Sequence, residues 1–176
     1  MNDFDAFIES AWAEHAEQTR EIADRLAASL HRVETADQVP RYAGLVSHVY
    51  GEHLGDIGSG VALLERLGAS VAAQGQPEAQ RAIARHTAAL RHVAGDATAT
   101  AELDGAERVG ALAAAAAMQA GRNAFDAALA TYQQALHGAE AGLAAAGVQA
   151  EVADQAARRR EALDPAASWR SASPPW

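Results

Sequence analysis

The sequence predicts an all-α protein built from antiparallel helical hairpins, arranged as an α-solenoid or as an irregular array of seven or eight helices. Three observations carry this prediction. Apolar residues recur at spacings of three and four along almost the whole chain, which is the period of an amphipathic helix. No segment alternates apolar and polar residues as a half-buried strand does. Alanine, the strongest helix former, supplies roughly a quarter of the chain.

Four helices are expected in the N-terminal half of the chain. The apolar stripes that predict them lie in residues 4–12, 22–33, 42–54 and 61–67. A break near Gln18 separates the first two stripes, because a single uncapped helix across both would exceed the usual length. Pro40 suits the first turn of the third helix. The glycine-rich segment 55–60 ends that helix, since glycine adopts the conformations that helix ends and turns require.

The C-terminal half is expected to contain four more helices, of which the last is polar and therefore peripheral. Their predicted ranges are 77–94, 103–120, 125–147 and 152–163. Pro77 favours a helix start and Gly121 favours a helix end. Residues 1–163 therefore form one predicted helical domain. Residues 164–176 form a flexible tail, and its Trp169 and Trp176 could dock on this domain or on a partner.

Composition excludes several classes of function. The formal net charge is −9, and all 14 basic residues are arginine, so an attraction to the phosphate backbone of nucleic acid is not expected. The chain has no cysteine, which excludes disulfides, thiol nucleophiles and cysteine-bound zinc. The first ten residues are acidic and lack the apolar run of a signal peptide, and no segment resembles a membrane span. We therefore expect a cytoplasmic protein that does not bind membranes.

Part of the seventh predicted helix resembles the second helix of a tetratricopeptide repeat. That family places a small residue, a large residue four positions later and a small residue three positions after that. Ala128, Tyr132 and Ala135 have this spacing. In such repeats the small residues let two helices approach, while the large residue fills the groove between neighbouring hairpins.

A second segment is similar to the same family. Gly55, Gly60, Leu64 and Leu67 have the 5-4-3 spacing of its loop glycine and second-helix positions. Together the two matches cover about a third of the chain. The resemblance implies an array of hairpins whose concave face binds a segment of another protein.

Histidine is the residue type that most suggests chemistry, since the chain has seven. His48 and Glu52 have the i, i+4 spacing that places two metal ligands on one face of an α-helix. His53 follows directly, and His86 could be brought near them by folding. However, the chain has no H-E-x-x-H motif and no pair of Glu-x-x-His motifs. The sequence therefore favours no metal and no other cofactor, with these four residues as the candidate ligands if a metal is bound.

The remaining patterns do not indicate an active site. The glycines of segment 55–60 lack the lysine of a phosphate-binding loop, and no strand is predicted before them. No G-x-S-x-G motif is present, so nothing indicates a serine nucleophile.

The function that the sequence favours is a protein–protein interaction module rather than an enzyme. Its partner is an unknown protein or peptide, and self-association is possible. Tyr42, His48 and Glu52 are the residues expected on the binding face. Two alternatives stay open. One is a metal-dependent helical-bundle enzyme that uses His48, Glu52 and His53, and the other is a helical bundle with an enclosed pocket for a small molecule.

Overall fold

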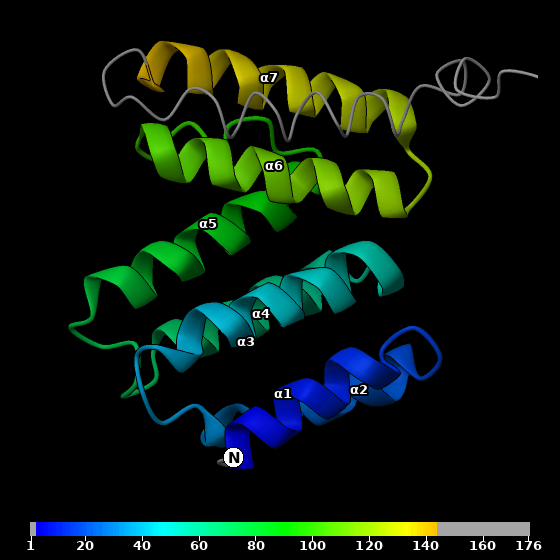
Figure 1. Ribbon diagram of the computed structural model, residues 1–176, viewed down its shortest axis with the longest axis vertical. Helices are drawn as coiled ribbons and strands as arrows, with labels where there is room; N and C mark the ends of the chain where they lie inside the picture. Colours follow the sequence, from blue (N-terminus) through cyan, green and yellow to red (C-terminus); the bar gives the residue numbers. More distant parts are fainter. Residues whose placement is uncertain (1–2, 144–176) are drawn as a thin grey trace, which may run out of the picture.

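A computed structural model describes residues 3–143 of the chain as an all-α array (Figure 1), which confirms the predicted fold class. Within these residues the chain forms seven α-helices, a short 3-10 helix, η1, and a π-helix, η2. The elements are α1 (Asp3–Glu14), α2 (Thr19–Ala28), η1 (Leu30–Arg32), α3 (Gln38–Ser47), η2 (His48–Leu54), α4 (Ile57–Gly68), α5 (Pro77–Val93), α6 (Gly105–Gly121) and α7 (Phe125–Leu143). The predicted helix at 152–163, the tail at 164–176 and the end of the helix at Gly147 lie outside the described residues.

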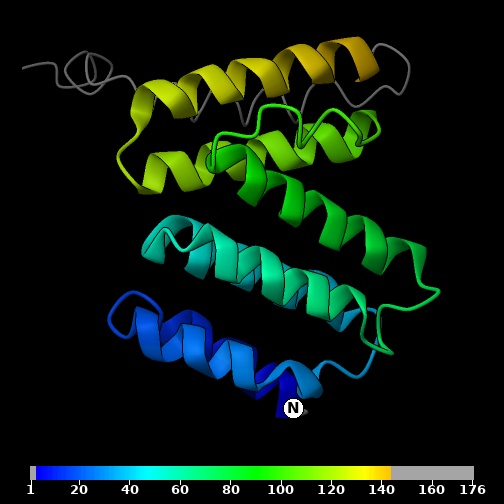
Figure 2. The same ribbon diagram turned by 180° about the vertical axis from the view of Figure 1, so that it is seen from behind.

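The helices are stacked in tiers along the longest axis of the molecule (Figures 1 and 2). The first tier is the α1/α2 hairpin, and the second is formed by α3, η2 and α4. The two tiers touch where α1 meets α3 and where α2 meets η2. Helix α5 packs on the second tier and on α6, and the α6/α7 hairpin completes the array. Helices that are consecutive in the sequence therefore pack against each other, as the short connections between them predict.

Local chemistry explains where several helices begin and end. The side chains of Asp56 and Asp104 accept hydrogen bonds from backbone N–H groups in the first turns of α4 and α6, which caps these helices. Pro77 occupies the first position of α5, as predicted. Gly55 ends η2 with a φ of 70°, a backbone conformation that glycine adopts without strain. The predicted break near Gln18 is the turn between α1 and α2.

The core runs through the first two tiers, α5 and one side of α6, and it includes Tyr42. From its sequence, Tyr42 was expected on a binding face. That expectation was wrong, because Tyr42 is completely buried and its hydroxyl donates a hydrogen bond to the carbonyl of Leu26. Burial accordingly raises the pKa of Tyr42 above its ordinary value. Trp12 differs from the other aromatic residues of the N-terminal half in remaining 42% exposed.

Small residues occupy the positions where helices approach most closely. A Cβ at Gly51 would lie 2.0 Å from Met118 Sδ, and one at Gly60 would lie 2.8 Å from Tyr50 Cβ. Both distances are below normal van der Waals contact, so these positions accept only glycine without rearrangement. The other residues of the two tetratricopeptide-like matches are also buried or at helix ends. They are Gly55, Leu64, Leu67, Ala128, Tyr132 and Ala135.

No helix within residues 3–143 combines the length and the hydropathy that crossing a membrane requires.

The variant Gly60→Ala is expected to lower the free energy of unfolding by about 1–3 kcal/mol. Its methyl group would overlap Tyr50 Cβ, which no change of rotamer can move away. Urea unfolding monitored by circular dichroism measures the loss. Gly58→Ala in the same helix is the matched control, because the nearest atom to its Cβ is 4.0 Å away. We expect this control to be neutral or slightly stabilising, since alanine is the better helix former. Equal stability of the two variants would contradict the proposed overlap.

His86 is expected to make the fold sensitive to acid. Burial lowers the pKa of His86 to about 4, and the nearby Arg85 guanidinium adds to this effect. Since the ordinary value is 6.5, the unfolded chain binds more protons than the folded chain between pH 6.5 and 4. The free energy of unfolding should therefore decrease, by at most about 3 kcal/mol from this residue, as pH falls through that window.

The measurement for His86 is urea unfolding at several pH values in the wild type and in His86→Gln. Carboxylates titrate in both proteins, so the difference between their pH slopes isolates His86. The variant should lose less stability in acid, whereas the exposed control His31→Gln should follow the wild type. Parallel slopes for wild type and His86→Gln would show that His86 is not held neutral.

Candidate metal centre

Three histidines from two tiers converge at one edge of the array. His15 lies in the turn after α1, while His48 and His53 lie in η2. The turn and η2 are on the same side of the molecule in both views (Figures 1 and 2). His48 Nε2 is 2.9 Å from His15 Nε2 and 3.1 Å from His53 Nε2. We call these three residues the histidine cluster; one nitrogen from each lies within 4.8 Å of the others.

The π-helix is what brings His48 and His53 together. On a regular α-helix, residues five apart point in clearly different directions, because each residue turns by about 100°. A π-helix closes its hydrogen bonds between residues i and i+5, so such a pair lies roughly one turn apart. His48 and His53 have this separation, and their ring centroids are 4.7 Å apart. The local widening of the helix therefore aligns two imidazoles on one face.

His48 is oriented by Glu52. The Nδ1 atom of His48 is 2.7 Å from Glu52 Oε2. An ionised carboxylate only accepts hydrogen bonds, so Nδ1 of His48 carries the proton and donates. In neutral His48 the lone pair is then on Nε2, the atom that faces the other two histidines. A carboxylate behind a histidine is the usual arrangement for a metal ligand, because it fixes both the tautomer and the ring.

Glu52 is itself held in place by α6. A Cβ built at Gly121 would lie 2.2 Å from Glu52 Cγ and 2.3 Å from Glu52 Oε1. The Glu52 side chain therefore occupies space that only a glycine at position 121 leaves free. Gly121, the last residue of α6, thus helps to orient His48 through the side chain of Glu52.

His15 is oriented by the backbone of α1, the helix that precedes it. Its Nδ1 atom is 2.7 Å from the carbonyl oxygen of Trp12. A carbonyl is also only an acceptor, so Nδ1 of His15 carries the proton and Nε2 carries the lone pair in the neutral ring. Neutral His15 and His48 would then face each other with two lone pairs across 2.9 Å. This contact is repulsive unless a proton or a metal cation lies between the nitrogens.

The electrostatic environment keeps His48 in the neutral state that a metal requires. Burial is the main cause that lowers the pKa of His48 below its ordinary value. The neighbouring His53 and His15 also lower it, while Glu52 opposes the shift. A neutral imidazole is the form that binds metal ions, so protons compete weakly for this position near neutral pH.

An exposed aromatic side chain borders the cluster. The ring of Trp12 lies 4.8 Å from the ring of His48 and 5.4 Å from the ring of His15, measured between centroids. His15 and His48 are half-buried, and His53 is exposed. The converging nitrogens are therefore reachable from solvent, with an apolar wall beside them.

The structure brings together some of the predicted site residues and separates another. His48, Glu52 and His53 form one site. His86 is not among the grouped ligands, and its Nδ1 atom instead hydrogen-bonds with Ser47 Oγ at 2.8 Å. His15 was missed as a candidate ligand, since it is 33 positions away from His48. No spacing in the sequence links the two residues, because only the stacking of the tiers brings them into contact.

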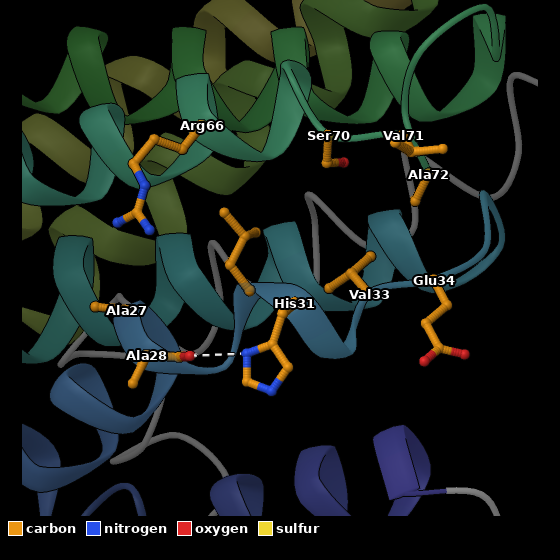
Figure 3. A pocket seen from close by; sticks show the side chains of 10 residues that line it. Ala27, Ala28, His31, Val33, Glu34, Arg66, Ser70, Val71 and Ala72 are labelled. Atoms are coloured by element: carbon orange, nitrogen blue, oxygen red, sulfur yellow. Dashed lines mark hydrogen bonds between the residues drawn. The ribbon is translucent and has the colours of Figure 1, made fainter.

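A separate cavity of about 640 Å³ lies between η1 and the C-terminal end of α4 (Figure 3). Small apolar side chains form much of its lining, and Arg66 and Glu34 are its charged residues. His31 also lines it, and the Nδ1 atom of His31 is 3.0 Å from the carbonyl oxygen of Ala28. None of these residues belongs to the histidine cluster. This cavity is open to solvent, and the enclosed pocket of the small-molecule alternative stays a prediction.

Comparisons of the chain with protein-family models, with curated proteins and with solved structures gave no match. The resemblance to tetratricopeptide repeats therefore rests on the spacing of the residues alone and stays a prediction.

Proposed function

We propose that this protein binds one divalent transition-metal ion through the Nε2 atoms of His15, His48 and His53. The observation that carries the proposal is the convergence of the three Nε2 atoms. Two of the three rings donate their Nδ1 protons to fixed acceptors, the Trp12 carbonyl and the Glu52 carboxylate, and so turn their Nε2 lone pairs toward one another. A cation between the nitrogens converts this repulsion into coordination.

The ligand set favours zinc and chemically similar ions. Neutral imidazoles suit Zn²⁺, Cu²⁺, Ni²⁺ and Fe²⁺, whereas Mg²⁺ and Ca²⁺ prefer oxygen ligands. A tetrahedral centre with bonds of about 2.0–2.1 Å places its nitrogens about 3.3 Å apart. The Nε2 atom of His48 is 2.9 Å from that of His15 and 3.1 Å from that of His53, and small movements of the rings bring both distances to this value.

This proposal differs from the function that the sequence favoured. Tyr42 is buried, and His48 and Glu52 bind each other within the histidine cluster. His48 and Glu52 thus support the metal alternative better than a binding face for a protein. Of the four candidate ligands, His86 does not join the cluster, and His15 was not among the candidates. Binding of a protein or peptide stays a prediction from the sequence, as do self-association and the cytoplasmic location.

Isothermal titration calorimetry with Zn²⁺ on protein stripped by a chelator tests the proposal. We expect one ion per chain in the wild type and loss of this binding in His15→Ala, His48→Ala and His53→Ala, because two imidazoles alone hold zinc weakly. His31→Ala is the matched control. Its Nδ1 atom bonds to the carbonyl three residues before it, as in His15, but no other possible metal ligand from residues 3–143 gathers with His31.

Either of two results would overturn the proposal. One is a wild-type protein that binds zinc no better than His15→Ala. The other is binding that His31→Ala removes as fully as the cluster variants do. Thermal unfolding gives an independent measure, since an ion at a hundred times its dissociation constant stabilises the folded state by about 2.7 kcal/mol. This gain should appear in the wild type and in His31→Ala only.

Glu52, and Gly121 against which it packs, should determine the affinity of the site for zinc. We expect Glu52→Gln to weaken zinc binding by about 10- to 100-fold, the usual effect of removing a partner behind a ligating histidine. Gly121→Ala should weaken binding in the same direction, because its methyl group displaces the Glu52 side chain. Competition with a zinc-sensitive dye measures both effects.

Gly105→Ala is the control for the α6 glycine, since no atom lies within 4 Å of its Cβ position. It should bind zinc as the wild type does. Wild-type affinity in Gly121→Ala would show that the packing of Glu52 against α6 does not support the site.

A further inference from the structure

The histidine cluster supplies three ligands and leaves room for a fourth. Within residues 3–143 the group of possible ligands around this point contains only His15, His48 and His53. The Glu52 carboxylate is paired with His48 Nδ1, on the side of the ring that faces away from Nε2. Zinc sites with three protein ligands hold a water molecule at the remaining position, and such sites are catalytic rather than structural.

We propose that the zinc-loaded protein hydrolyses small aryl esters, with Trp12 as the wall against which the aromatic part of the substrate packs. This inference rests on the proposed metal binding. Three neutral imidazoles leave the double positive charge of the ion undiminished, and zinc in such surroundings brings the pKa of its bound water to about 7. The fourth position can therefore supply hydroxide at neutral pH.

Access to the site selects the substrate class. His53 is exposed, so an ester carbonyl can reach the ion from solvent. The Trp12 ring is 42% exposed and lies beside the rings of His48 and His15. A flat aromatic group can stack on the exposed part of Trp12 while its ester carbonyl lies over the ligands.

The reaction is an ordinary hydrolysis in which no atom changes oxidation state. Water at the fourth position gives one proton to solvent, and its oxygen bonds to the carbonyl carbon of the ester. The bond between that carbon and the aryl oxygen breaks, and the aryl oxygen leaves as phenolate with the electron pair. The carboxylic acid product gives a second proton to solvent, and a new water molecule binds to the ion. The products are thus one carboxylate, one phenolate and two protons.

Hydrolysis of 4-nitrophenyl acetate, followed by the absorbance of 4-nitrophenolate, tests the inference. Free imidazoles cleave this ester slowly, so the metal-free protein is the baseline. Zinc blocks the imidazole lone pairs of the cluster and would lower the rate if they were the only nucleophiles. We expect zinc instead to raise kcat/KM by about tenfold or more. The gain should be absent in His53→Ala and retained in His31→Ala.

The Trp12 side chain is tested separately at saturating zinc. Trp12→Ala should raise KM by about two- to tenfold with little change in kcat, and Trp12→Phe should retain most of the wild-type behaviour. The backbone carbonyl that orients His15 is present in both variants. Calorimetry on the same samples reports zinc affinity, so lost metal binding cannot be mistaken for lost substrate binding.

The outcomes separate this inference from the proposal on which it depends. Stoichiometric zinc binding with a rate equal to or below that of the metal-free protein overturns the hydrolytic activity and leaves metal binding intact. Absence of zinc binding overturns both. Equal KM values in the wild type and Trp12→Ala, with zinc-dependent hydrolysis present, overturn the role of Trp12.

Discussion

The packing of η2 against its neighbours is the constraint on which the rest of the site depends. Gly51 lets the π-helix approach Met118 of α6, and Gly121 leaves the space that the Glu52 side chain fills. Both contacts hold η2 against α6. The π-helical geometry of η2 then places His48 and His53 on one face, and the turn after α1 brings His15 next to them. The geometry of the cluster thus follows from tight packing of small residues in a chain with few large ones.

The sequence predicted the helices well and the site only in part. Spacing of apolar residues is a local signal, and it placed the break near Gln18 and the start of α5 at Pro77 as the structure has them. It did not reveal the π-helix, because Val49, Tyr50 and Leu54 fit the pattern of a regular helix equally well. The expectation for Tyr42 failed for a related reason. Periodicity shows which face of a helix is apolar, but it does not show how completely neighbouring tiers cover that face.

The missed ligand illustrates a second limit. His48 and Glu52 could be paired from their spacing, since both belong to one helix. His15 joins them only because the α1/α2 hairpin stacks on the second tier, a contact between residues 33 positions apart. Sites assembled by tertiary packing leave no fixed interval in the sequence. In the sequence nothing distinguishes His15 from His31, whose Nδ1 atom also lies close to the carbonyl oxygen three residues before it.

The distribution of the ligands over two tiers has a mechanical consequence. A bound ion would join the turn after α1 to η2 and so close a loop of the chain that includes all of α2 and α3. In a protein without cysteine, this coordination would act as a removable cross-link that anchors the N-terminal hairpin. Loss of the ion would remove this cross-link and leave the buried core and the hydrogen bonds of Tyr42 and Tyr50 to hold the hairpin on the second tier. The end of the molecule that carries Trp12 would then respond most strongly to the supply of metal.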